Sequence, residues 1–125
     1  MKRLNSVCLI TQNVPRLSDF YQSVLETVPE GDDQFGAFTV PGAKLSIFSS
    51  QALEKMIPGL MVDSGSGNCF LEFEVDDVDQ EYKRLQDLKV AVIKPPTTQP
   101  WGIRSVWFTD PDGNKINFYA WITSE

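Results

Sequence analysis

One order of predicted elements, a strand followed by a helix and further strands, occurs twice along the chain at a spacing of about 60 residues. The first copy covers residues 1–60 and the second covers residues 68–125, with a Gly- and Ser-rich linker at 61–67. Because each copy has one long helix, one face of its sheet is covered and the other must be buried elsewhere or form a cleft. We therefore expect a single α+β domain over residues 1–125, made of two βαβββ units that form a curved mixed sheet with a cleft.

The first copy carries clear local signals for a helix and a hairpin. An apolar run at 4–10 predicts a strand, and Asn13 followed by Pro15 is typical of the start of a helix. An apolar stripe at helical spacing continues from there, and Pro29 to Asp33 are expected to end the helix. The remaining elements are a hairpin of strands at 35–40 and 43–49 about Pro41-Gly42 and a short helical turn at 51–56.

The second copy ends in the strongest local signal of the chain. Two strand-like runs, 103–109 and 115–121, flank Asp110-Pro111-Asp112-Gly113-Asn114, whose residue types favour a tight turn. This pattern predicts a hairpin. Upstream, the copy is expected to hold a strand at 69–75, a helix opened by Asp77 with Gln80, a short strand at 90–93 and an irregular Pro-rich loop at 95–100.

The composition limits the partners that the chain can have. Its hydrophobic fraction of 42% and charged fraction of 22% are typical of a globular protein, and no apolar run approaches the ~20 residues of a membrane span. The net charge of −6, most of it in the second half, disfavours nucleic acid and anionic membranes and favours a cationic partner. Cys8 and Cys69 lie inside strand-like runs, so we expect both to be reduced in a cytoplasmic protein.

Several segments together resemble the vicinal oxygen chelate superfamily, the glyoxalase, bleomycin-resistance and extradiol-dioxygenase proteins. They are Phe20-Tyr21 on the first helix, the run from Phe73 to Asp79, Trp101-Gly102, and the turn from Asp110 to Asn114. The resemblance covers nearly the whole chain and implies a glyoxalase/bleomycin-resistance fold. It also implies a homodimer, in which the units are sometimes exchanged between chains.

The resemblance further implies where a metal would bind in an enzyme of this superfamily. The four ligand positions, usually His or Glu, fall here on Ser6, Ser46, Phe70 and Asn117. The chain has no histidine, and hydroxyl, phenyl and amide groups are poor or incapable ligands for zinc, iron, manganese or nickel. We therefore expect no metal and no other cofactor.

Loss of the metal leaves the cleft, and its predicted lining suits a flat, cationic ligand. Aromatic faces and carboxylates in a partly dry groove attract such molecules. The bleomycin-resistance type, which sequesters an antibiotic without altering it, is therefore the favoured hypothesis. The expected ligand-binding residues are Phe38, Phe48, Phe70, Glu72, Glu74, Trp101, Trp107, Asn117 and Tyr119.

Two other hypotheses remain open at this point. A metal-independent lyase or isomerase-like enzyme would use Glu72 as its base, with Cys8 or Cys69 as a nucleophile. A non-catalytic interaction module would have its cleft filled by Phe70 and Trp107 packed on each other. Arg104 is a candidate salt-bridge partner of Glu72 in any of these cases. The strand register between Glu26 and Pro58 and the identity of the ligand stay open.

Overall fold

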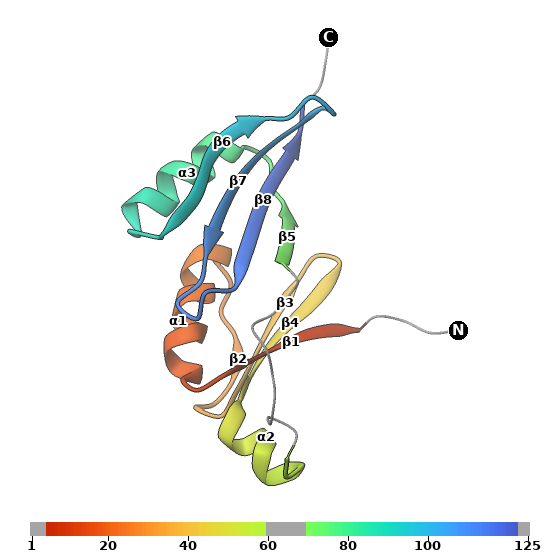
Figure 1. Ribbon diagram of the computed structural model, residues 1–125, viewed down its shortest axis with the longest axis vertical. Coiled ribbons are helices and arrows are strands. Elements are labelled where there is room, and N and C mark those ends of the chain that lie inside the picture. The colour runs from red at the N-terminus through yellow and green to blue at the C-terminus, as the bar shows by residue number, and fades with distance from the viewer. Residues whose placement is uncertain (1–4, 60–69, 123–125) are drawn as a thin grey trace, which may run out of the picture. The chain divides into compact units, whose positions relative to one another are not determined.

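A computed structural model describes residues 5–59 and 70–122 of the chain. The chain divides into two compact units, Met1–Ser66 and Gly67–Glu125. The expected linker at 61–67 and Cys69 lie outside the described residues. Among the described residues, each unit combines a four-stranded mixed sheet with helix, two helices in the first unit and one in the second, which confirms the predicted α+β class (Figure 1).

The first unit forms a sheet with the strand order β1-β4-β3-β2. Strands β1 and β4 run parallel, and the other neighbouring pairs run antiparallel. Between β1 and β2 the chain forms α1, which packs on β3 and β4. The elements are β1 (Ser6–Thr11), α1 (Val14–Leu25), β2 (Glu30–Gly31), β3 (Phe35–Val40), β4 (Ala43–Ser49) and α2 (Ser50–Met56).

Helix α1 begins as the sequence predicts and ends earlier. The Asn13 side chain caps it by accepting a hydrogen bond from the backbone N–H of Arg16 at 3.1 Å. The helix ends at Leu25, because Glu26 adopts a left-handed conformation with φ 53°, so the residues from Pro29 onward are not its terminator. Its buried side chains are Val14, Leu17, Tyr21 and Val24.

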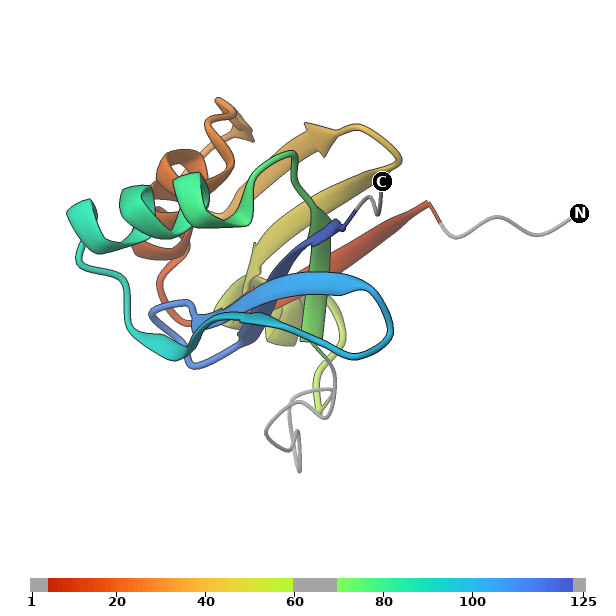
Figure 2. The ribbon, with the colours of Figure 1, turned by 90° about the horizontal axis from the view of Figure 1, so that it is seen from above.

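The second unit repeats this plan with the strand order β5-β8-β7-β6. Strands β5 and β8 are parallel, and the other neighbouring pairs are antiparallel. Helix α3 packs on β6, β7 and β8 and lies along one face of this sheet (Figure 2). The elements are β5 (Phe70–Glu74), α3 (Val78–Asp87), β6 (Val92–Thr98), β7 (Ile103–Thr109) and β8 (Lys115–Trp121).

Strands β7 and β8 form the hairpin at the end of the second unit, which we call the tail hairpin. Its strands have the bounds that the sequence predicts, and a buried carboxylate holds its turn. Asp110, 4% exposed, accepts hydrogen bonds at Oδ1 from the backbone N–H groups of Asp112 at 2.9 Å and Asn114 at 2.8 Å. Its Oδ2 accepts from the side-chain amide of Asn114 at 2.7 Å. Gly113 has φ 86°, a conformation that glycine adopts without a steric penalty.

The Pro-rich stretch after α3 differs from the prediction. Residues 95–98 were expected to form an irregular loop and instead belong to β6, which runs from Val92 to Thr98. Because β6 is an edge strand, Pro95 and Pro96 remove no hydrogen bond that an inner strand would need. The register with β7 shifts twice across this segment, between Val92 and Lys94 and again between Lys94 and Thr97.

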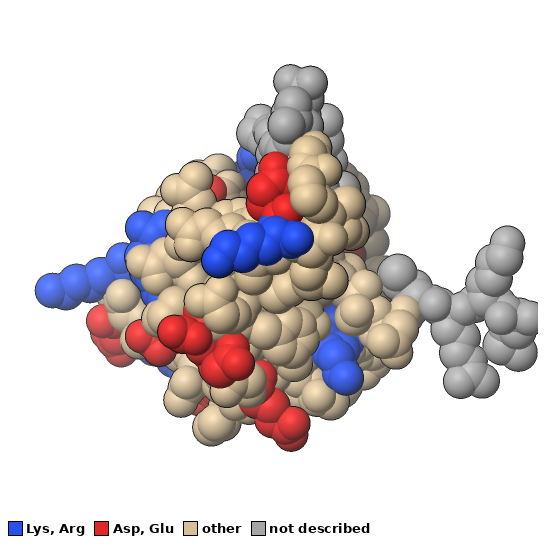
Figure 3. Space-filling view, turned by 90° about the horizontal axis from the view of Figure 1, so that it is seen from below, with Lys and Arg blue, Asp and Glu red and all other residues tan. Residues whose placement is uncertain are grey.

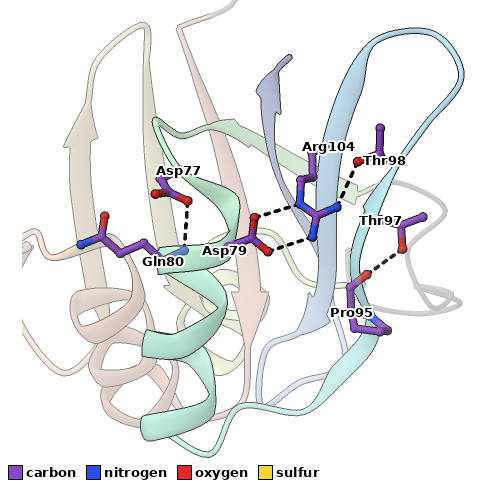
Figure 4. A network of polar contacts seen from close by, with 7 residues as sticks. All are labelled: Asp77, Asp79, Gln80, Pro95, Thr97, Thr98 and Arg104. Carbon is purple, nitrogen blue, oxygen red and sulfur yellow. Dashed lines mark hydrogen bonds and ion pairs between the residues drawn. The ribbon is translucent and has the colours of Figure 1, made fainter. Parts of the chain in front are cut away.

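A salt bridge ties the start of α3 to the sheet. The guanidinium of Arg104 on β7 donates to both carboxylate oxygens of Asp79, at 2.9 and 2.8 Å, and also to the hydroxyl of Thr98 at 3.0 Å (Figure 4). Asp77 caps the same helix by accepting from the backbone N–H of Gln80 at 3.1 Å, as the sequence predicts. The bidentate geometry holds the first turn of α3 against β7.

This salt bridge gives the unit a stability that depends on pH. Hydrogen bonding from Arg104 lowers the pKa of Asp79 below its ordinary value of 3.8. A lowered folded-state pKa contributes stability above the unfolded-state pKa, and this contribution is lost as the pH falls through the folded-state pKa. We expect thermal unfolding to show wild type more stable than Asp79→Asn at neutral pH, with the gap closing below about pH 4 and shrinking in salt.

The matched control is Asp87→Asn at the other end of α3, where no described ion pair is removed. Because Asp87→Asn breaks no ion pair among the described residues, it should lower the melting temperature at neutral pH less than Asp79→Asn does. If the difference in melting temperature between wild type and Asp79→Asn were equal at neutral and acidic pH, the salt bridge would not be the source of this pH dependence.

Candidate functional site

The face of the second sheet opposite α3 carries most of the predicted ligand-binding residues. Residues paired across neighbouring strands share a face. The register pairs Glu72 with Asn117 and Asn117 with Trp107, and it pairs Glu74 with Tyr119. Phe70 lies two residues before Glu72 on β5 and therefore shares its face. We call this surface the helix-free face; its residues are Phe70, Glu72, Glu74, Lys94, Thr97, Ile103, Ser105, Trp107, Thr109, Lys115, Asn117, Tyr119 and Trp121.

The centre of the helix-free face is a hydrogen-bonded pair of residues 45 positions apart in the sequence. The side-chain amide nitrogen of Asn117 donates to Glu72 Oε2 at 2.9 Å. Asn117 is 2% exposed on the inner strand β8, whereas Glu72 and Glu74 on the edge strand β5 are exposed. A buried amide therefore holds a solvent-facing carboxylate in place.

Two aromatic pairs stand on either side of these polar groups. The rings of Phe70 and Trp107 meet edge to face with centroids 4.7 Å apart, and Phe70 remains 49% exposed. Further along the strands, the rings of Tyr119 and Trp121 lie 6.3 Å apart. Trp121 was not among the residues expected from the sequence, although its alternation with Asn117 and Tyr119 places it on the same face.

Two predicted lining residues belong to the first unit, and they lie on opposite faces of its sheet. Phe38 pairs with Leu45, is 0% exposed and approaches Tyr21 of α1 with ring centroids 6.3 Å apart. Phe38 is therefore a core residue on the helix-covered face, and its assignment as a lining residue is corrected. Phe48 pairs with Phe35 on the other face, where their rings lie 5.9 Å apart.

Trp101 and Arg104 lie away from the polar pair. Trp101 is 66% exposed in the turn from Gln99 to Gly102, and among the described residues its ring meets none of the other aromatic rings. Arg104 does not pair with Glu72, because it lies on the α3 side of the sheet and binds Asp79. The basic residues that do share the helix-free face are Lys94 and Lys115, and neither was singled out from the sequence.

The donor set at the family's metal-ligand positions does not fit a metal ion. Phe70 offers a ring that packs on Trp107, and the amide of Asn117 points its nitrogen at Glu72. Ser46 is 6% exposed beside Cys8 in the register, and Ser6 lies on the same face. Within residues 5–59 and 70–122 no group of three or more His, Cys, Asp or Glu side chains is arranged to hold a metal.

The structure offers little for nucleophilic chemistry at the described cysteine. Cys8 has an exposed surface, yet partial burial of its thiol raises the pKa of that group. A raised pKa lowers the fraction of thiolate, which is the nucleophilic form. Glu72 keeps only the amide of Asn117 as its described hydrogen-bond partner.

Charge is mixed on the side of the molecule seen in Figure 3, where basic side chains stand among acidic ones with broad uncharged areas between them. None of the described helices is long and apolar enough to cross a membrane.

Two βαβββ units, each with a helix on one face of a mixed sheet, define a glyoxalase-type fold. A solved glyoxalase/bleomycin resistance protein/dioxygenase family enzyme from Burkholderia phytofirmans superposes with a TM-score of 0.85 at 19% identity, covering 97% of this chain and 100% of that one. A solved protein of unknown function from Agrobacterium tumefaciens gives a TM-score of 0.80 at 27% identity, covering 96% and 94%.

The sequence comparisons agree with this fold. A metallothiol transferase FosB from Lysinibacillus sphaericus is 24% identical over 96% of this chain and 83% of its own length. The model of the Glyoxalase/Bleomycin resistance protein/Dioxygenase superfamily matches residues 3–118. The chain belongs to that superfamily.

Proposed function

We propose that this protein binds a cationic aromatic small molecule on the helix-free face without a metal, as an antibiotic-sequestering protein would. The observation that carries the proposal is the Glu72–Asn117 pair flanked by the exposed edge of the Phe70–Trp107 pair. A carboxylate supplies charge and neighbouring π faces supply stacking surface, which is the combination that such cations prefer. The proposal includes the homodimer and the cytoplasmic location expected from the sequence.

The name of the FosB relatives favours a metal-dependent transferase, but the side chains of this chain do not support one. Serine, phenylalanine and asparagine at the family's ligand positions supply no anionic or imidazole donor. A metal-independent enzyme with Glu72 as base lacks a described second group positioned to act with it. Binding alone requires neither.

A tryptophan-fluorescence titration with bleomycin tests the proposal. We expect saturable quenching that weakens at high salt, because the attraction to an exposed carboxylate is screened. Glu72→Gln should weaken binding about tenfold through loss of the charge. Glu30→Gln, which changes the net charge equally on β2 of the other unit, should leave the affinity unchanged. Absence of quenching at any salt concentration would remove the proposed ligand class.

One observation favours a second candidate, the non-catalytic interaction module. The contact between Phe70 and Trp107 is the arrangement expected if these rings fill the face themselves. The 49% exposure of Phe70 argues for the binding role, since a filled face would bury this ring. The titration distinguishes the two, because an interaction module would bind no small cation.

A further inference from the structure

One of the two polar atoms in the side chain of Asn117 forms a hydrogen bond, and the other has no hydrogen-bond partner among the described residues. Its nitrogen donates to Glu72 at 2.9 Å, while Oδ1 is buried without a hydrogen-bond partner among the described residues. A buried carbonyl oxygen without a donor costs about 1–3 kcal/mol, and folded proteins contain few of them. Asn117, which carries this oxygen, lies at the centre of the helix-free face, between Glu72 and Trp107 in the register.

The orientation of the amide follows from its neighbour. An ionised carboxylate only accepts hydrogen bonds, so Asn117 must turn its NH₂ group toward Glu72. The opposite orientation would place two acceptors against each other. Glu72 therefore fixes Oδ1 as an acceptor on the remaining side of the amide.

The cations of the same face do not satisfy these acceptors. Lys94 lies beside Trp107 in the register and Lys115 beside Phe70, and both are exposed. Among the described residues, neither forms an ion pair with Glu72 or Glu74. The pair of Asn117 and Glu72 thus combines an exposed carboxylate with a buried acceptor, Oδ1, that has no donor within the described part of the chain. A donor from outside reaches Oδ1 only when the exposed side chain of Glu72 moves aside.

We infer that the ligand's charged group is a protonated nitrogen with at least two N–H bonds, an amidinium, guanidinium or primary ammonium. One N–H donates to Oδ1 of Asn117 and another to the carboxylate of Glu72, while the attached ring contacts the Phe70–Trp107 pair. This inference rests on the proposed function and narrows its ligand class. A quaternary ammonium has the same charge and no donor, so it leaves Oδ1 unsatisfied.

The test compares two probes of equal charge that each carry one phenyl ring, benzamidinium and benzyltrimethylammonium. Affinities are measured by calorimetry, together with the shift of the Asn117 side-chain NH₂ resonances in NMR titrations. We expect wild type to bind benzamidinium at least about tenfold more tightly, the size of one charge-assisted hydrogen bond. The preference should vanish in Asn117→Leu, which lacks the oxygen, and in Glu72→Gln, because the introduced glutamine amide can itself donate to Oδ1.

A measurement without ligand keeps the inference open to refutation. The substitution is made in a Glu72→Leu background, where the hydrogen bond from Asn117 Nδ2 to the carboxylate is already absent. Replacing a buried amide without a partner by an apolar group of similar size is neutral or stabilising, so adding Asn117→Leu should not lower the melting temperature of that background. A clear drop in melting temperature would mean that Oδ1 is satisfied in the free protein and would overturn the inference. Asn114→Leu, whose amide has a partner in Asp110, should melt lower.

The remaining outcomes separate this inference from the proposed function. Equal affinities for the two probes would overturn the inference and leave a binder of aromatic cations in place. Binding of neither probe would also overturn it, since the pair would then not recognise the charged nitrogen. Bleomycin quenching decides the proposed function independently in each case.

Discussion

Replacement of Asp110 by alanine is expected to destabilise the second unit by about 3 kcal/mol, because three hydrogen bonds to one buried carboxylate are lost. The backbone N–H groups of Asp112 and Asn114 and the side-chain amide of Asn114 all donate to Asp110, which is 4% exposed. Because the carboxylate is buried and these three hydrogen bonds are part-buried, water replaces it less well than at an exposed turn. Thermal unfolding should show a melting temperature lower by roughly 10 °C.

A second turn in the same protein provides a control that isolates burial. Asp32 also accepts two backbone N–H bonds, from Gln34 at 2.8 Å and Phe35 at 3.0 Å, but it is exposed. Asp32→Ala should cost about 1 kcal/mol, since water reaches the freed donors. Asp110→Asn should fall between the two, because it keeps one oxygen acceptor. Equal losses for Asp110→Ala and Asp32→Ala would contradict the role given to burial.

The tail hairpin could be predicted from the sequence because its information is local. The strand bounds Ile103–Thr109 and Lys115–Trp121 follow from β-branched and aromatic runs, and the turn between them from Asp, Pro and Gly. The same holds for the caps Asn13 and Asp77, each of which accepts from an N–H three residues on. In each case the residues that fix the conformation are a few positions apart.

The expectations for Phe38 and Arg104 each placed a side chain on the wrong face of its strand. In both cases the alternation of nearby residues was enough to identify the correct face. The two-residue turn Pro41-Gly42 pairs Val40 with Ala43, which forces Phe38 opposite Leu45 and away from the face of Phe48. Arg104 has the parity of Val106 and Phe108, which are fully buried on the α3 side. Alternation alone therefore excludes Arg104 as a partner of Glu72.

The centre of the candidate site could not be predicted as a pair. Glu72 and Asn117 were each expected to line a cleft, but their contact depends on the parallel pairing of β5 with β8 across 45 residues. A shift of that register by one residue would turn one of the side chains to the other face. The unpartnered oxygen of Asn117 depends on this contact as well, since Glu72 sets the orientation of the amide.

Gly31→Ala is the substitution in the first unit with the largest expected effect. Gly31 has φ 140°, a conformation available essentially to glycine alone. A Cβ built there would lie 2.0 Å from the carbonyl oxygen of Phe35, so the backbone of the β2–β3 connection must move. We expect a loss of about 2–3 kcal/mol in the free energy of unfolding, measured with urea.

Gly42→Ala in the β3–β4 turn is the control for this substitution. It tests the cost of a positive φ alone, without the steric clash expected at Gly31. Gly42 also has a positive φ, 90°, but a Cβ there would meet no atom within 4 Å. Only the left-handed conformation is penalised, and the loss should be about 1 kcal/mol. Amide exchange adds a local readout, because Gly31→Ala should release the pairing of Glu30 with Ala37 while leaving that of Phe38 with Leu45 protected. Losses of equal size in the two variants would show that the approach of Phe35 to Gly31 does not limit this position.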